Sequence, residues 1–107
     1  MTYRILYTDQ FHETIEAQLV YWADHGAPLT RTTEWLTDLF DLLDSLDESP
    51  YRFPIAEPET RGRGIKIHKI AFRDYLIFYH VDDKQRTVYL LGLQHGRRQR
   101  GTEKDDR

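Results

Sequence analysis

The residues of this chain best suited to chemistry are basic and belong to its second half. The set comprises Arg61, Arg63, Lys66, Lys69, Arg73, Arg97, Arg98 and Arg100, and interleaved with it are Tyr75, Tyr79, His80 and His95. A guanidinium group can hold a phosphate through two parallel hydrogen bonds, and an aromatic ring can stack on a base. The pattern therefore favours binding of a polyanion. The alternatives are that these residues bind an acidic protein partner or only keep a sheet edge soluble.

The same residues suggest one reaction. Cleavage of RNA through its 2′-hydroxyl needs a base, an acid and a cation beside the developing charge. His95 is the candidate acid or base, and Arg73 or Arg97 is the candidate cation. If the protein is an enzyme, we expect a metal-independent endoribonuclease.

Metal and cofactor chemistry has little support in the sequence. The chain has five histidines and no cysteine, so thiolate metal sites, Cys nucleophiles and disulfides are excluded. No HExxH pattern occurs. His68 and His80 fall on neighbouring predicted strands, but a tight turn at Arg73-Asp74 places them on opposite faces. We expect no metal and no organic cofactor.

Charge divides the chain into unlike halves. Residues 1–50 carry two bases and ten acids, a net charge of −8, whereas residues 51–100 carry eleven bases and five acids, a net charge of +6. This asymmetry favours an acidic partner for the second half, or attraction between the halves within the fold. An acidic helix face at Asp38, Asp41, Asp44, Asp47 and Glu48 is typical of solvated surface.

Length and composition indicate one small domain. The chain has 107 residues, 39% of them hydrophobic, and we assign residues 1–99 to the domain and 100–107 to a polar tail that we expect to be frayed. The first ten residues lack signal-peptide features, and no apolar run approaches the roughly 20 residues that span a bilayer. We expect a cytoplasmic protein without membrane contact.

The elements that would position the basic residues follow from periodicity. Residues 3–8 predict a strand, and apolar residues from Phe11 to Ala23 predict a helix that ends at His25-Gly26-Ala27-Pro28. A second helix is expected from about residue 29 to 47, then a loop over 49–64. Strands are expected over 65–72, 75–81 and 87–93. The predicted class is α+β, in the order β-α-α-β-β-β, with an antiparallel helical hairpin on one face of a small antiparallel sheet.

Residues 71–99, with the sequence AFRDYLIFYHVDDKQRTVYLLGLQHGRRQ, resemble the C-terminal half of RelE/ParE superfamily toxins. The shared features are a Tyr-rich central strand, an acidic turn, and a last strand that closes on His-x-Arg-Arg, here His95 to Arg98. The N-terminal strand, the helical hairpin and the loop between Pro50 and Pro58 follow the same order. The resemblance thus covers residues 3–99, and it implies the fold already expected and a toxin of a bacterial type II module silenced by a cognate antitoxin.

The resemblance leaves the target open. The RelE branch cuts mRNA on the ribosome, and for that activity Lys66, Lys69, Arg73 and His95 fall in matching places, but no Tyr follows Arg98. The ending resembles the ParE and plasmid-stabilisation branch, some of whose members poison DNA gyrase without catalysis. We expect a ParE-like growth inhibitor, with a ribonuclease or a non-toxic relative as alternatives. The residues expected to bind target or antitoxin are Arg61, Arg63, Lys66, Lys69, Tyr79, Arg97 and Arg98.

Overall fold

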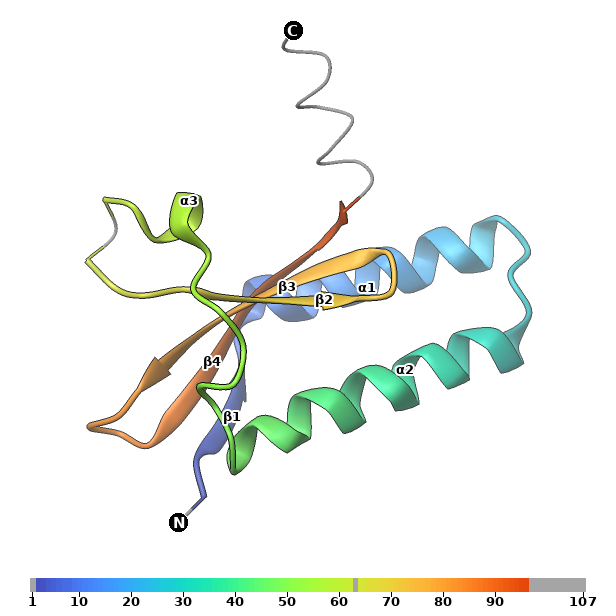
Figure 1. The fold of residues 1–107 in the computed structure, drawn as a ribbon. Helices are drawn as coiled ribbons and strands as arrows, with labels where there is room; N and C mark the ends of the chain where they lie inside the picture. Colours follow the sequence, from blue (N-terminus) through green and yellow to red (C-terminus); the bar gives the residue numbers. More distant parts are fainter. Residues whose placement is uncertain (1, 63, 97–107) are drawn as a thin grey trace, which may run out of the picture.

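A computed structural model describes residues 2–62 and 64–96, apart from the side chains of residues 58 and 59. The elements are β1 (Arg4–Tyr7), α1 (Asp9–Asp24), α2 (Leu29–Asp44), a 3-10 turn (Ser45–Asp47), α3 (Glu57–Thr60), β2 (His68–Phe72), β3 (Tyr75–Asp82) and β4 (Thr87–His95) (Figure 1). The predicted α+β class and order are confirmed, and the short α3 lies inside the predicted loop. The predicted tail lies outside the described residues.

The direction of the first strand differs from the prediction. The sheet has the order β1-β4-β3-β2, and β2, β3 and β4 form the expected antiparallel meander. However, β1 pairs with β4 in parallel, from Arg4 opposite Thr87 to Tyr7 opposite Leu90. Parallel neighbours require a long crossover between the strands. The helical hairpin and the meander supply it, so the sheet is mixed rather than antiparallel.

Local signals explain where the helices begin and end. The hydroxyl oxygen of Thr8 accepts a hydrogen bond from the Phe11 N–H at 3.3 Å, which caps α1, and the Thr8 hydroxyl donates to the Leu90 carbonyl of β4 at 2.7 Å. Gly26 has a φ of +77°, a left-handed conformation that favours glycine, directly after α1. Pro28 then precedes α2. One threonine therefore fixes both the start of α1 and its place against the sheet.

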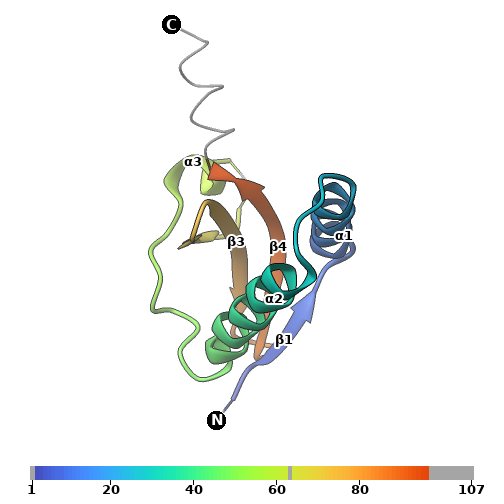
Figure 2. The same ribbon diagram turned by 90° about the vertical axis from the view of Figure 1, so that its right-hand side faces the viewer.

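The main core lies between the helical hairpin and one face of the sheet. Figure 2 shows α1 and α2 on one side of the strands and the segment with α3 on the other. Each helix contributes two apolar side chains to this core: Phe11 and Ile15 from α1, and Leu39 and Leu43 from α2. The strands contribute Ile70, Phe72, Tyr75, Ile77, Tyr79, Val81, Val88, Leu90 and Leu93. A smaller cluster of Ala56, Ile67 and Phe78 joins the α3 segment to the opposite face. No helix within residues 2–62 and 64–96 is long and apolar enough to cross a membrane.

A bulge interrupts the pairing of β3 with β4. Phe78 lies opposite Gly92, but the next residue of β3, Tyr79, lies opposite Leu90. Leu91 is therefore an extra residue in β4 without an opposite partner. Because side chains alternate between the two faces of a strand, the extra residue reverses which face each later residue of β4 occupies.

A carboxylate joins three segments at the β3–β4 turn. Asp83 accepts hydrogen bonds from the hydroxyls of Tyr3 and Tyr51, each at 2.5 Å, and Arg86 lies 4.4 Å above the Tyr3 ring. These bonds lower the pKa of the Asp83 carboxyl and raise those of both phenols, because they favour the ionised carboxylate and the neutral hydroxyls. The N-terminal strand and the loop after the second helix are thereby attached to the turn.

Replacing Asp83 with Asn should give a pH-dependent loss of stability. The lowered pKa means that the carboxylate stabilises the fold above its unfolded-state pKa of about 4, and that this contribution is lost as the pH falls through the folded value. Urea unfolding should show D83N less stable than wild type near pH 7, with the difference narrowing below about pH 4. The matched control is Asp41→Asn on exposed helix surface. A difference that stays constant with pH would contradict this role.

The Tyr79 hydroxyl should contribute to stability through one buried hydrogen bond. It donates to the Pro50 carbonyl at 2.7 Å, and burial raises the pKa of Tyr79 to about 12. Tyr79→Phe leaves that buried carbonyl without its partner, which should lower the free energy of unfolding by about 1–2 kcal/mol. Tyr89→Phe is the control, since Tyr89 is half-buried and its hydroxyl makes no hydrogen bond within the described part of the chain. Equal losses in the two variants would show that the Tyr79 bond contributes nothing.

Candidate functional site

Five aromatic side chains meet where the helical hairpin reaches the end of the sheet. Trp35 of α2 lies 4.9 Å from Trp22 of α1, 5.2 Å from Tyr75 of β3 and 5.6 Å from Phe72 of β2, measured between ring centroids. Tyr75 in turn lies 5.0 Å from His95 of β4. The contacts have the tilted or edge-to-face geometry that aromatic pairs prefer. This aromatic cluster connects both helices to three strands, and Trp22 contributes to the walls of two pockets.

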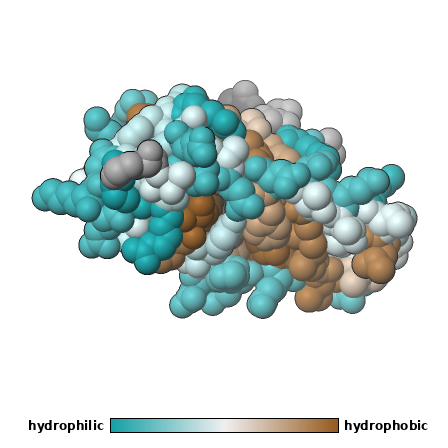
Figure 3. Space-filling view, turned by 90° about the horizontal axis from the view of Figure 1, so that it is seen from below, coloured by the Kyte–Doolittle hydropathy of each residue, from teal (hydrophilic) through white to brown (hydrophobic). Residues whose placement is uncertain are grey.

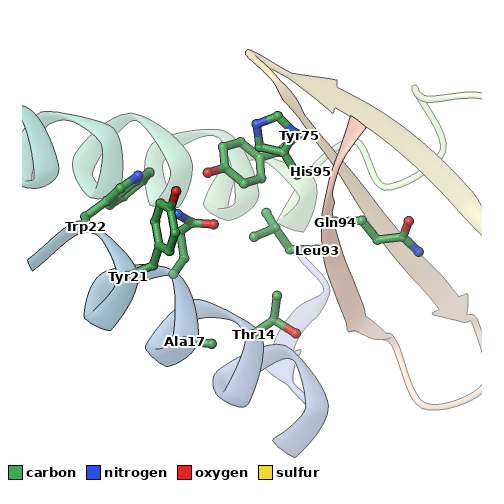
Figure 4. A pocket seen from close by; sticks show the side chains of 9 residues that line it. Thr14, Ala17, Tyr21, Trp22, Tyr75, Leu93, Gln94 and His95 are labelled. Atoms are coloured by element: carbon green, nitrogen blue, oxygen red, sulfur yellow. The ribbon is translucent and has the colours of Figure 1, made fainter. Parts of the chain in front are cut away.

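The larger of these pockets, here called the α1 pocket, has a volume of about 510 Å³. Its walls are Thr14, Ala17, Gln18, Tyr21 and Trp22 of α1, and Tyr75, Leu93, Gln94 and His95 of the strands. Figure 4 shows the Tyr75 and His95 rings against each other at one side, with Tyr21 and Trp22 approaching from α1, while the Gln94 side chain points away. The pocket thus offers aromatic faces and a half-buried imidazole to a ligand or a partner side chain.

The second pocket, here called the Trp35 pocket, has a volume of about 220 Å³. Its walls are Trp22, Ala27, Arg31, Thr32, Trp35 and Arg73. Trp35 is 5% exposed, and its indole N–H has no hydrogen-bond acceptor within the described residues. An unpaired buried donor costs about 1–3 kcal/mol, and such groups are rare in native structures. The Trp35 side chain therefore lines a pocket, while its indole nitrogen is sealed from solvent and has no acceptor among the described residues.

Arg73 lies in the β2–β3 turn and already has protein partners. It forms an ion pair with Asp38 of α2, and its guanidinium group lies 5.2 Å from the centre of the Phe72 ring. Its φ of +53° is unusual for a residue other than glycine. The predicted catalytic arginine thus connects the turn to the acidic face of α2 and lines the Trp35 pocket.

The bulge in β4 places His95 on the helix-facing side of the sheet. His95 lies opposite Tyr75, and Leu93 lies opposite Ile77, so both share a face with the main core. Lys69 lies opposite Phe78, and that pair belongs to the other face. If Leu91 paired with Phe78 in a regular register, alternation would put His95 on the face of Lys69. The candidate acid or base is therefore separated from this lysine by the thickness of the sheet.

The remaining predicted basic residues lie on or beside that other face. Arg61 and Lys66 are exposed in the segment around α3, which packs on Phe78 through Ala56 and Ile67. The Ala56 N–H donates to the Ile67 carbonyl at 2.7 Å, which closes this segment into a loop over the sheet. Arg61, Lys66 and Lys69 therefore belong to one basic side of the molecule, here called the α3 side. Arg63, Arg97 and Arg98 lie outside the described residues.

Tyr79 does not belong to a binding surface. It is fully buried, its ring stacks on His68 at 4.9 Å, and its hydroxyl is bonded to Pro50. The prediction for Tyr79 is wrong because its strand, central in the sheet, is covered on that face by the helices and the loop after them. The predicted placement of His68 and His80 on opposite faces is confirmed, since His68 lies opposite Tyr79. No group of three potential metal ligands occurs within residues 2–62 and 64–96.

Sequence reasoning missed the helix residues of the site. Trp22 was expected only as part of an apolar helix face, and Trp35 was not singled out, although the chain has just two tryptophans. The helices also expose apolar side chains near their connection: Val20, Tyr21 and Leu29 are 59%, 55% and 78% exposed. Figure 3, viewed from below Figure 1, shows apolar side chains gathered in a stretch bordered by hydrophilic ones. Exposed apolar surface of this kind is typical of interaction sites.

Comparison with solved structures supports the fold. The chain is similar to a protein in the RelBE2 toxin–antitoxin complex of Mycobacterium tuberculosis, with a TM-score of 0.59 and 18% identity over 89% of this chain and 92% of that one. It is also similar to a protein in the archaeal RelE–RelB complex of Pyrococcus horikoshii OT3, with a TM-score of 0.53 and 17% identity over 90% of this chain and 97% of that one. At these identities the likeness shows the fold alone.

The family assignment comes from the sequence. No curated protein matches the chain significantly. The family model described as the ParE toxin of the type II toxin–antitoxin system parDE matches residues 5–100, which is nearly the whole chain. The chain belongs to the ParE toxin family of type II toxin–antitoxin systems.

Proposed function

We propose that this toxin acts in the cytoplasm by binding DNA gyrase, inhibits growth without catalysis of its own, and is neutralised by a cognate antitoxin. The observation that carries the proposal is the separation of His95 from Lys69 by the sheet. A ribonuclease needs an acid, a base and a charge-stabilising cation around one phosphate. The sheet keeps His95 and Lys69 on opposite faces, and the ParE family match favours the gyrase-binding branch.

The state of Arg73 supports the same proposal. A guanidinium group that is to stabilise developing charge must be free to face the reacting phosphate. Arg73 is instead paired with Asp38, which belongs to the hairpin. A partly exposed pair of this kind contributes little stability, but it lowers the positive potential that Arg73 could offer to RNA. Arg73 is thus better placed to position the turn than to act on a substrate.

A ribosome-dependent mRNA endoribonuclease is the second candidate. Two observations favour it: His95 is half-buried in the wall of an open pocket, and the similar solved structures are of RelE-type complexes. On this alternative His95 would act as acid or base, and Arg73 would have to leave Asp38 to stabilise charge. A non-toxic relative that acts only as a binding partner is the third candidate.

A cognate antitoxin is supported by two features. Both similar structures are of a toxin with its antitoxin. In addition, residues 51–100 have a net charge of +6, and the α3 side carries exposed Arg61 and Lys66. Complementary charge speeds association and weakens as salt increases. We therefore propose an antitoxin with acidic residues, whose binding becomes weaker in high salt.

Induction of the toxin alone should stop DNA synthesis before protein synthesis. A gyrase poison blocks replication and induces DNA-damage responses, whereas loss of mRNA stops translation first. Pulse labelling of both syntheses after induction makes the comparison, and co-induction of the antitoxin serves as the control. A prompt fall in protein synthesis would replace the gyrase proposal with the ribonuclease, and no growth effect would favour the non-toxic relative.

The His95→Ala variant should separate the two mechanisms in vitro. For the gyrase proposal, purified wild-type toxin inhibits supercoiling and cleaves no ribosome-bound mRNA. If His95 were a general acid or base, wild type would cleave and H95A would cleave about a hundredfold or more slowly. His12→Ala is the matched control, because His12 is exposed at the start of α1. Cleavage by wild type that H95A loses and H12A retains would contradict the proposal.

A further inference from the structure

The outer edge of β4 is paired along only part of its length. β1 pairs with β4 from Thr87 to Leu90, and the Thr8 amide and hydroxyl both donate to the Leu90 carbonyl where β1 ends. On its other side β4 pairs with β3 as far as His95. Among residues 2–62 and 64–96, no strand lies along the outer edge of β4 beyond Leu90. Residues 91–95, here called the free edge, can therefore accept a further strand.

The register identifies which backbone groups point out of the free edge. The Gly96 N–H donates to the Asp74 carbonyl at 2.7 Å, so the backbone of Gly96 is directed to the β3 side. Successive residues of an antiparallel strand direct their N–H and C=O groups to alternate sides. Gln94 is therefore bonded toward β3, whereas Leu93 and His95 direct both groups outward. No hydrogen bond to these outward groups occurs within the described part of the chain.

Two pockets border the free edge, one on each face of the sheet. The α1 pocket lies on the helix side. The other, here called the Gln10 pocket, has a volume of about 180 Å³ and lies between Gln10 and Thr14 of α1 and Phe78 on the opposite face. Leu93 and Gln94 line both pockets, although their side chains point to opposite faces. The backbone of the free edge therefore separates the two pockets and borders both.

This arrangement matches the side chains of an added strand. Successive side chains of a strand point to opposite faces, so one would enter the α1 pocket and the next the Gln10 pocket. No Lys, Arg, Asp or Glu of the described residues lines either pocket. A charged side chain would be desolvated there without a partner of opposite charge. Uncharged, mainly apolar side chains therefore fit both pockets.

Helix α1 restricts the occupant to a single segment. Figure 4 shows Thr14 and Ala17 of α1 on the other side of the α1 pocket from Leu93. Gln10 also lies beside the edge, since its amide nitrogen is 4.0 Å from where a Cβ on Gly92 would lie. A second copy of this chain would bring its own α1 to the same place, so both helices would compete for the space beside the paired edges. An isolated extended segment carries no such helix.

We propose that an uncharged, extended segment of the antitoxin adds to the free edge as a strand, bonded to the backbone of Leu93 and His95, with alternate side chains in the α1 and Gln10 pockets. The inference rests on the proposed function, because it needs an antitoxin. In strand addition the backbone hydrogen bonds supply affinity, and the pockets select the side chains. The added strand lies in line with β1.

Amide hydrogen exchange, measured by NMR of ¹⁵N-labelled toxin, tests the pairing residue by residue. In the free toxin the Gln94 amide should exchange slowly, and the Leu93 and His95 amides faster. Antitoxin should slow the Leu93 and His95 amides by about tenfold or more, and cross-strand Hα contacts should join the two proteins there. Unchanged exchange in a complex that forms normally would overturn the proposal.

Two further outcomes of this experiment would contradict strand addition. Slow exchange without cross-strand Hα contacts would mean that another structure, such as a helix, covers the edge. Slow exchange of Leu93 and His95 already in the free toxin would mean that the chain itself or a second copy occupies the edge.

A substitution on α1 tests the pocket without altering β4. Ala17 is exposed on the helix, and Ala17→Trp would fill the α1 pocket with an uncharged ring. Antitoxin affinity should fall by about tenfold or more. His12→Trp is the matched control, because His12 is exposed on α1 and lines neither pocket. Wild-type affinity in A17W, or an equal loss in H12W, would refute the proposal, whereas an antitoxin that fails to bind wild-type toxin would instead contradict the proposed function.

Discussion

The extra residue in β4 determines how this molecule presents its chemistry. Alternation in a strand is strict, so a single unpaired residue such as Leu91 exchanges the faces of all that follow. It directs Leu93 into the main core and His95 toward the helices. The Tyr75–His95 contact of the aromatic cluster and the α1 pocket therefore depend on the bulge, because His95 and Leu93 help form the walls of that pocket. A regular β4 would put the histidine on the face of the sheet that carries Lys69 instead.

The parts of the fold that could be predicted are those with local causes. Helical periodicity, Gly26 and Pro28 place the hairpin within a few residues, and the short turn at Arg73 implies an antiparallel meander. The parallel pairing of β1 has no local signal, because apolar alternation does not encode strand direction. The bulge has none either, since Leu90, Leu91 and Leu93 are all acceptable strand residues. Both features are set by how distant segments pack.

The dependence on how distant segments pack also explains why part of the candidate site could not be predicted from the sequence. A list of basic and aromatic residues along three strands says nothing about which face each one takes once the register shifts. Tyr79 is one of the aromatic residues interleaved with the basic set in the sequence, yet it lies in the central part of the sheet with helix and loop above it. Trp35 lies in the main core, and neither its contacts with both helices and the strands nor its place in a pocket wall has a local signal in the sequence. Residue type predicted the chemistry available, but packing decided where it is available.

The sheet consequently divides the toxin into two surfaces of different character. The helix side combines aromatic walls, exposed apolar residues such as Val20 and Leu29, and Arg31, which forms no ion pair with any residue that the structure describes. The α3 side carries Arg61, Lys66 and Lys69 over a small satellite cluster. An antitoxin bound on the helix side would cover His95 or its surroundings without needing to touch Lys69. If the target contacts the helix side, such an antitoxin neutralises by competition. If the target contacts the α3 side, neutralisation requires that the antitoxin also extend around the sheet edge, where the basic residues would attract its acidic segment.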